Sequence, residues 1–297
     1  MVQSYILHLL KMFIRIKKKF KSAMFSNIYL EHFYHFMALK IFQKRNMNFP
    51  FGKRNKNLKV DYLNLFNQTK NTEYDDVISF EKLTEYQIDK EWLNDLALLT
   101  QVTLKNSEIC YAHGRVLYSA LSRYLKDTED NFINVIETGT SKGFSSLCMA
   151  KALNDHNYDG IIRTIDIIPS NKEIYWNNIS DFDGKKTRFN MLEKWSDLID
   201  KYIIYIEGTS KKILKKLIID RVNFAFLDGS HTYYDVLNEF KYVADRQISG
   251  DIIIVDDYNK QYKGLMKASD KLSLKYNYKQ NIVNSSTNRS YLICQKI

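Results

Sequence analysis

Glycines and carboxylates follow the apolar segments of this sequence at spacings that suit ligand binding. The stretch Asn134 to Ser146 reads NVIETGTSKGFSS, an apolar run that passes into a loop with two glycines and then into a helix-like segment. Gly139 and Gly143 permit tight turns and close approach to backbone amides, and a helix start presents such amides to an anionic group. The stretch predicts a strand–loop–helix cradle for a ligand, with an ordinary strand-to-helix turn as the alternative.

Glu137 indicates what kind of ligand the cradle would hold. A carboxylate at a strand end suits a ligand with ammonium or hydroxyl donors and repels a pyrophosphate. The spacing Glu-x-Gly-x-x-x-Gly also lacks the third glycine of the dinucleotide fingerprint. These features favour S-adenosylmethionine over NAD as the cofactor, with Thr140 and Ser145 completing the predicted binding loop.

More candidate cofactor contacts follow the next two apolar segments. Asp166 lies 23 residues after the second glycine of the cradle, near the end of the segment 161–168. An acid at the end of the second strand can accept hydrogen bonds from both ribose hydroxyls. Gly208 and Thr209 follow the third segment, where Thr209 could cap the next helix or face an adenine edge.

The order of these segments predicts the fold class. The predicted strands are 133–136, 161–168, 202–206, 222–227 and 251–255, followed by a hairpin of 276–283 and 291–295. Helix-like segments separate the first five, which is typical of an α/β fold with a doubly wound, mostly parallel seven-stranded sheet and a C-terminal antiparallel hairpin. Ligands bind beyond the carboxyl ends of such strands, so the carboxylates there should converge on one rim.

Three carboxylates at this rim could hold a metal ion. Asp228 follows the fourth strand, and Asp256 and Asp257 follow the fifth. Carboxylate oxygens suit a hard divalent cation such as magnesium, which keeps some positions for water or substrate. The sequence therefore predicts a Mg²⁺ site, although one acid could instead cap a helix while another is solvated.

The combined motifs resemble a known family. The spaced glycines after Glu137, the acid Asp166, the run FLDGSHTY from Phe226 to Tyr233 and the run VDDY from Val255 to Tyr258 are similar to those of class I S-adenosylmethionine-dependent methyltransferases. The likeness is strongest to macrocin-type and related small-molecule O-methyltransferases and covers about residues 110–297. It implies a Rossmann-like methyltransferase fold.

The resemblance also implies a mechanism. A metal on Asp228, Asp256 and Asp257 would bind two neighbouring hydroxyls of a sugar or other small polyhydroxylated acceptor and lower the pKa of one. His231 would remove that proton. A competing interpretation is that His231 only hydrogen-bonds a neighbouring loop.

The N-terminal region differs from the rest in charge. The chain of 297 residues has a net charge of +10, but residues 1–60 hold 13 Lys and Arg against one acid. Apolar residues at helical spacing in 6–16, followed by four lysines, predict a basic amphipathic helix. We expect 1–60 to be a helical extension, 61–130 a helical lead-in and 131–297 the S-adenosylmethionine-binding catalytic domain. Thr84 and Gln87 have the spacing of a capping box within the lead-in.

Composition and motifs limit the cellular compartment and the binding partners that we expect for this protein. Three widely spaced cysteines and no apolar run near 20 residues predict a cytoplasmic protein, with peripheral contact to the inner face of the membrane through residues 1–45 as one option and a homo-oligomer as another. Nucleic-acid base methylation is disfavoured because no Pro-Pro sequence follows the fourth strand. A membrane-associated lipid or quinone methyltransferase and a cofactor-binding protein without turnover are the alternatives to a small-molecule O-methyltransferase.

Overall fold

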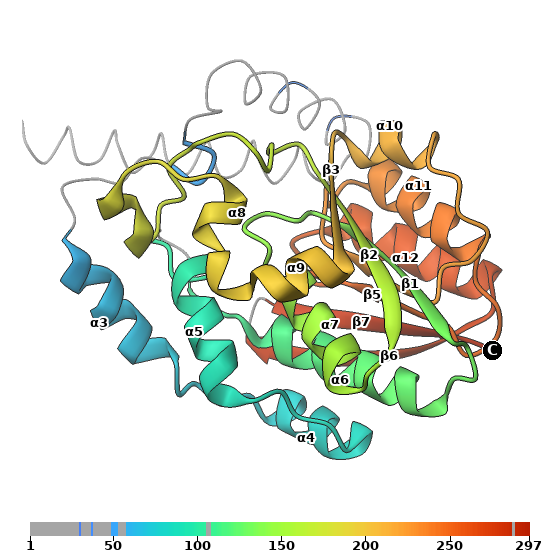
Figure 1. Cartoon of the computed structure of the whole chain (residues 1–297). Helices are drawn as coiled ribbons and strands as arrows, with labels where there is room; N and C mark the ends of the chain where they lie inside the picture. The colour runs from blue at the N-terminus through green and yellow to red at the C-terminus, as the bar shows by residue number, and fades with distance from the viewer. Residues whose placement is uncertain (1–29, 31–36, 38–48, 53–57, 105–107, 287–288) are drawn as a thin grey trace, which may run out of the picture.

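The computed structural model describes residues 30, 37, 49–52, 58–104, 108–286 and 289–297. Its centre is a seven-stranded sheet with the strand order β3-β2-β1-β4-β5-β7-β6 (Figure 1). The strands are β1 (Phe132–Thr138), β2 (Asp159–Asp166), β3 (Ile203–Glu207), β4 (Phe224–Leu227), β5 (Ile252–Val255), β6 (Tyr278–Ser286) and β7 (Arg289–Lys296). The first five are parallel to one another, whereas β7 pairs antiparallel with β5 and β6.

The central strands are apolar on both faces, as parallel strands covered by helices must be. In β4, Phe224 and Phe226 point to one face and Ala225 and Leu227 to the other, and all four are buried. The four residues of β5 are likewise buried and divide between the same two apolar layers. Burying a large apolar side chain contributes about 1.5–3 kcal/mol, so these short strands are held by packing on both sides.

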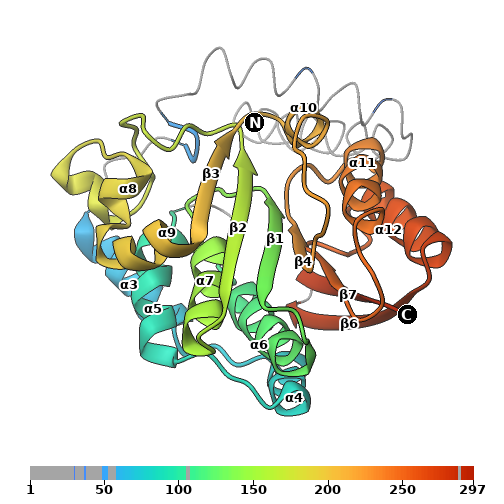
Figure 2. The same ribbon diagram turned by 45° about the vertical axis from the view of Figure 1, so that its right-hand side comes forward.

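Helices cover both faces of the sheet. One layer holds α6 (Ala112–Asp127), α7 (Phe144–Asp155) and α9 (Ser196–Tyr202), and the other holds α10 (Ser210–Leu214), α11 (Tyr233–Ala244) and α12 (Lys263–Lys275). Figure 2 shows the second group beyond the sheet from α6 and α7, while β1, β2 and β3 point toward the same edge. The long connection from β2 to β3 also contains η1 (Ile179–Asp183), α8 (Arg188–Met191) and η2 (Glu193–Trp195).

The lead-in forms three helices that pack onto the first layer. These are α3 (Lys59–Thr69), α4 (Asp75–Thr84) and α5 (Lys90–Thr100), and their apolar residues join the same core as the sheet. Arg115 of α6 makes a two-pronged contact with Glu81 of α4, at 2.7 and 2.6 Å. The predicted Thr84–Gln87 capping box is wrong, because Thr84 ends α4 and the side chain of Asp89 caps α5 by accepting from the Trp92 amide at 2.7 Å.

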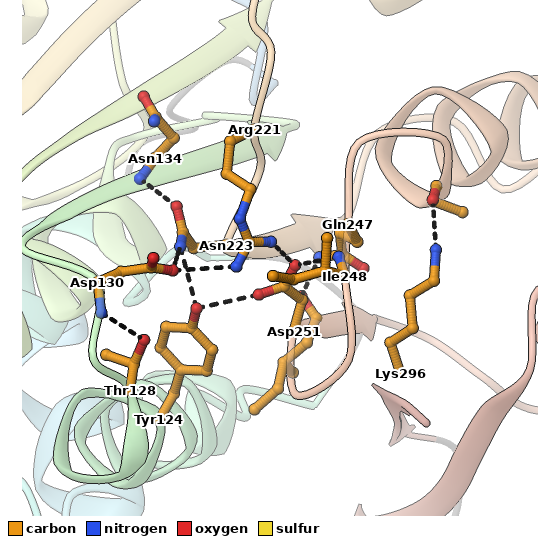
Figure 3. Close-up of polar contacts among 12 residues, drawn as sticks. Tyr124, Thr128, Asp130, Asn134, Arg221, Asn223, Gln247, Ile248, Asp251 and Lys296 are labelled. Atoms are coloured by element: carbon orange, nitrogen blue, oxygen red, sulfur yellow. Dashed lines mark hydrogen bonds and ion pairs between the residues drawn. The ribbon is translucent and has the colours of Figure 1, made fainter.

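A polar network joins the amino ends of β1, β4 and β5 to the end of α6 (Figure 3). At its centre the buried Asp251 accepts hydrogen bonds from the Tyr124 hydroxyl at 3.0 Å and the Ile248 amide at 2.7 Å, and it pairs with Arg221. Arg221 also contacts Asp130 at 3.0 Å. The network lies at the edge of the sheet opposite the carboxyl ends of the parallel strands.

The predicted sheet, its doubly wound order and its C-terminal antiparallel hairpin are confirmed. The predicted domain limits at 60 and 130 stay predictions, and most of the basic extension lies outside the described residues. Within the part of the chain that the structure describes, no helix has both the length and the apolar character needed to cross a membrane.

Candidate active site

The predicted site residues lie along one rim of the sheet, at the carboxyl ends of β1 to β5. They are Glu137, Gly139, Thr140, Gly143, Ser145, Asp166, Gly208, Thr209, Asp228, His231, Asp256 and Asp257. Parallel pairing brings them together, because every strand from β3 to β5 ends at this edge. Their individual roles stay predictions, whereas their positions can be described one by one.

Gly139 and Gly143 shape the loop between β1 and α7. Both have φ of +93°, a left-handed conformation that side chains rarely adopt. A Cβ on Gly139 would lie 2.0 Å from the backbone oxygen of Asp228, so only glycine fits where the β1 loop crosses the end of β4. Gly143 is the N-cap of α7, and Ser145 lies in the first turn of that helix. The amino end of α7 is therefore presented at the rim without a capping side chain.

Glu137 lies behind this loop, fully buried. Its two carboxylate oxygens accept hydrogen bonds from the hydroxyls of Ser145 and Ser146. Burial raises the pKa of Glu137, and the two hydrogen bonds oppose this shift without cancelling it. Thr140 is also turned inward, and its hydroxyl lies 2.5 Å from that of Thr164. In this structure Glu137, Thr140 and Ser145 brace the loop from inside.

Asp166 ends β2 and holds the loop from the side. Its carboxylate accepts hydrogen bonds from the Ser141 amide at 2.6 Å and the Ile168 amide at 2.8 Å, and burial raises its pKa. The Gly208 amide donates to the Asp166 backbone oxygen at 2.7 Å, which brings the β3 end to the same point. Thr209 precedes α10 and makes no side-chain cap there. Each Asp166 oxygen retains a lone pair, so the carboxylate can still accept from ligand hydroxyls.

Arg188 is a site residue that the sequence did not reveal. Its side chain is buried, and its guanidinium donates to the backbone oxygens of Ser141 at 2.9 Å and Ile168 at 3.2 Å. The rings of Trp176 and Tyr205 flank it at 5.6 and 5.0 Å. Burial lowers its pKa, and the nearby Asp166 opposes that shift. The long connection from β2 to β3, which contains α8, carries Arg188 to the site.

Asp228, His231 and Asp257 form a second group at the rim. The His231 Nε2 lies 3.3 Å from Asp228 Oδ1, and its Nδ1 lies 3.6 Å from Asp257 Oδ2. The Tyr262 ring packs edge to face against the His231 imidazole, with 4.6 Å between the ring centroids. This packing restricts the orientation of the imidazole. The sequence did not single out Tyr262. Both ring nitrogens of His231 thus face carboxylates, and the group remains partly exposed.

The electrostatics of this group favour a shared proton. Burial, with the charge of Asp256 adding to it, raises the pKa of Asp228 to about 7. Burial lowers the pKa of His231, but the Asp228 hydrogen bond and the nearby carboxylates outweigh it and raise that pKa overall. A carboxyl whose pKa is raised and an imidazole whose ring nitrogen lies beside it can hand a proton between them, which is the property required of an acid–base pair.

Asp256 is paired with an arginine from the C-terminal hairpin. Arg289 Nη2 and Nε donate to its Oδ2 and Oδ1, the latter at 3.3 Å, while Nη1 donates to the Cys110 backbone oxygen at 3.0 Å. Burial opposes ionisation of Asp256, but the Arg289 charge outweighs it and lowers the pKa of that carboxyl. The Arg289 Nε also lies 3.9 Å from Asp257 Oδ1.

The predicted magnesium ligands do not fit a metal ion in this arrangement. Asp228, Asp256 and Asp257 are engaged by His231 and Arg289, and the described residues contain no group of three or more acidic, histidine or cysteine side chains suited to a metal. A guanidinium that already bonds both oxygens of Asp256 leaves no room for the close, octahedral oxygen shell that Mg²⁺ requires.

The comparison with known proteins agrees with the fold and the motifs. Residues 136–258 match a family model described as a methyltransferase domain. One similar solved structure is that of the O-methyltransferase TomG from Streptomyces achromogenes in complex with SAM, with a TM-score of 0.51 and 15% sequence identity. The match covers 75% of this chain and 97% of the TomG chain. The O-methyltransferase NovP has a TM-score of 0.50 at 16% identity, covering 69% and 98%. No curated protein matches the sequence. At these identities the structural likeness shows the fold alone.

Proposed function

We propose that this chain, whose residues 136–258 match a methyltransferase domain model, is an S-adenosylmethionine-dependent methyltransferase that methylates a hydroxyl oxygen of a small polyhydroxylated acceptor such as a sugar. One observation carries the proposal. The Asp228–His231 pair lies at the rim, and the Asp228 backbone is in contact range of the Gly139 loop that would hold the cofactor. A proton acceptor therefore stands next to the predicted source of the methyl group.

Each group of residues has a definite task in this reaction. The loop from Gly139 to Gly143, the carboxylate of Asp166 and the β3 end at Gly208 would hold the cofactor. When bound, S-adenosylmethionine supplies an electrophilic methyl group, whose bond to sulfur breaks as its bond to the acceptor oxygen forms. The acceptor hydroxyl loses its proton to the Asp228–His231 pair, which makes the oxygen nucleophilic. Arg188 keeps the loop at Ser141 in place, so that positioning contributes to the rate.

The nature of the acceptor is the finer part of the proposal. A hydroxyl needs a base at neutral pH, whereas an amine of ordinary pKa loses its proton more readily, so an acid–base pair at the rim supports oxygen as the acceptor atom. A cytoplasmic location, peripheral membrane contact through residues 1–45 and a homo-oligomer remain proposals from the sequence, because residues 1–29 lie outside the described residues.

Calorimetric titration of the full chain with S-adenosylmethionine tests the cofactor assignment. We expect Asp166→Ala to weaken binding at least about tenfold, which corresponds to about 1.4 kcal/mol. Asp159→Ala is the matched control, because Asp159 begins the same strand at the opposite edge. Equal affinities for wild type and Asp166→Ala would contradict the assignment.

The acceptor assignment is tested by S-adenosylhomocysteine release with a panel of sugars and other polyols. His231→Ala should bind the cofactor normally but lose about 10²–10⁴-fold in turnover, the usual range for a proton-transfer residue. His156→Ala, a histidine packed on Tyr86 away from the rim, should keep full turnover. Full activity of His231→Ala would remove the base from the proposal.

A further inference from the structure

The contact between Arg289 and Asp256 places a positive charge beside the carboxylates at the rim. We infer that the Arg289 guanidinium takes the place of a divalent cation beside Asp256 and Asp257, so that methyl transfer by this chain needs no divalent metal. The chemical consequence rests on the proposed function, whereas the exclusion of a metal from this position rests only on the geometry of the rim.

The backbone fixes Arg289 at this position. Because β7 runs antiparallel to β5, the start of β7 lies beside the end of β5, where the acidic pair follows. The Tyr258 amide donates to the Ser290 backbone oxygen at 2.9 Å, and the Ser290 hydroxyl donates back to the Tyr258 oxygen. These two bonds hold the residue before Ser290 opposite Asp256 and Asp257. Arg289 is therefore a built-in part of the rim.

The guanidinium is fully committed to this site. Nη2 and Nε bond the two oxygens of Asp256, and Nη1 bonds the Cys110 backbone oxygen. Arginine is the side chain whose planar donor fork matches a carboxylate in this two-pronged way. One edge of the fork bonds Asp256 and Nη1 bonds the loop before α6, so an ion could reach Asp256 only if these hydrogen bonds were broken.

The charges lead to the same conclusion. Mg²⁺ binds carboxylate oxygen at about 2.1 Å, so an ion on Asp256 would lie against a permanent positive charge that already contacts the same oxygens. In a partly buried site the repulsion between such neighbours is several-fold stronger than in water. Arg289 instead supplies positive charge directly to Asp256 and, at 3.9 Å, to Asp257.

Arg289 acts here as a positioning residue. It contacts Asp256 and lies 3.9 Å from Asp257, which in turn faces Nδ1 of His231 at 3.6 Å. This chain of contacts directs the other ring nitrogen, Nε2, toward Asp228. The proton of the acceptor hydroxyl then passes to the Asp228–His231 pair without help from a metal-bound oxygen.

Metal binding by the full chain tests the inference without an acceptor. Mn²⁺ titration followed by electron paramagnetic resonance, with Mg²⁺ calorimetry beside it, should show no saturable site in the wild type at millimolar ion. Arg289→Ser should create one, because it frees both oxygens of Asp256. Arg289→Lys retains a positive charge and should not. Arg123→Ser, an exposed arginine on α6, is the control and should behave as the wild type.

The outcomes separate this inference from the proposed function. Saturable Mn²⁺ binding by the wild type that is lost in Asp256→Asn would overturn the inference, whether or not Arg289→Ser folds. Cofactor binding in the same wild-type sample would leave the methyltransferase assignment intact in that case. Conversely, absence of cofactor binding would overturn the proposed function while the metal result stood by itself. With an active acceptor in hand, turnover unchanged by EDTA is the expected result.

Discussion

Glu239 is a buried carboxyl whose ionisation the fold resists. It lies on α11, about 1% exposed, and one of its oxygens accepts from the Thr138 hydroxyl at 2.9 Å. Burial raises its pKa from the ordinary 4.5 to about 7. Between these values the unfolded chain releases the proton and the folded chain keeps it, so stability falls as pH rises through this window and levels off above about pH 7.

Glu239→Gln removes this titrating group and should therefore make the stability of the fold depend less on pH. The full shift from 4.5 to about 7 corresponds to at most about 3.4 kcal/mol at 1.36 kcal/mol per pH unit. We therefore expect the variant to lose less stability than the wild type between about pH 5 and about pH 8, measured as the free energy of unfolding in denaturant. Glu193→Gln, an exposed glutamate, is the control and should follow the wild type. Parallel curves for Glu239→Gln and the wild type would show that Glu239 ionises freely in the folded state.

The sequence predicts which residues lie at the candidate site better than it predicts what each side chain does there. The sequence located Asp166, Asp228 and His231 because carboxylates and a histidine directly follow strands. It could not show that Glu137 turns inward to two serines, since that depends on how α7 is rotated. Arg289 was missed because its partner Asp256 is 33 residues away, across an antiparallel pairing that only the assembled sheet provides.

The β1–α7 loop is the element that we propose holds the cofactor, and Gly139→Ala tests this proposal. The added Cβ would lie 2.0 Å from the Asp228 backbone oxygen, so the loop or the β4 end must move. We expect lower thermal stability and loss of S-adenosylmethionine affinity. Gly250→Ala is a matched control, because Gly250 has the same φ of +93° but no neighbour within 4 Å of the added Cβ.

Comparing the two glycine variants separates backbone strain from the close approach. Both should lose about 1 kcal/mol to the left-handed conformation, and only Gly139→Ala should lose cofactor affinity as well. Normal affinity in Gly139→Ala would mean that the loop does not contact the cofactor. Calorimetry at a temperature where both variants are folded gives the comparison.

Elements with strong apolar runs were predictable, and their ends were less so. β4 and β5 are short runs of buried apolar residues, so pattern alone located them within two residues of the observed limits. The start of α5 was misplaced because Thr84 satisfies the capping-box spacing, while the nearer Asp89 wins by accepting directly from the Trp92 amide. Local hydrogen-bond competition of this kind leaves little trace in periodicity.

At the scale of the whole molecule, the candidate site and the Asp251 network lie at opposite edges of one sheet. The doubly wound order could be predicted, because alternating strands and helices permit few arrangements. The network around Asp251 could not, since its members come from α6 and from the segments before β1, β4 and β5. It ties together the amino ends of strands whose carboxyl ends carry the candidate site.

Asp251→Ala should therefore destabilise the fold without changing the site. Removing the buried carboxylate leaves the Tyr124 hydroxyl and the Ile248 amide without their acceptor and Arg221 without one of its two partners. We expect a loss of roughly 2–4 kcal/mol in the free energy of unfolding, less than for a fully buried ion pair because Arg221 is partly exposed.

Asp127→Ala, which breaks an exposed pair with Arg123 within α6, is the control and should change stability by less than about 1 kcal/mol. If the two edges are independent, cofactor affinity at low temperature stays at the wild-type value in both variants; a parallel loss of affinity in Asp251→Ala would mean that the amino-end network also sets the geometry of the rim.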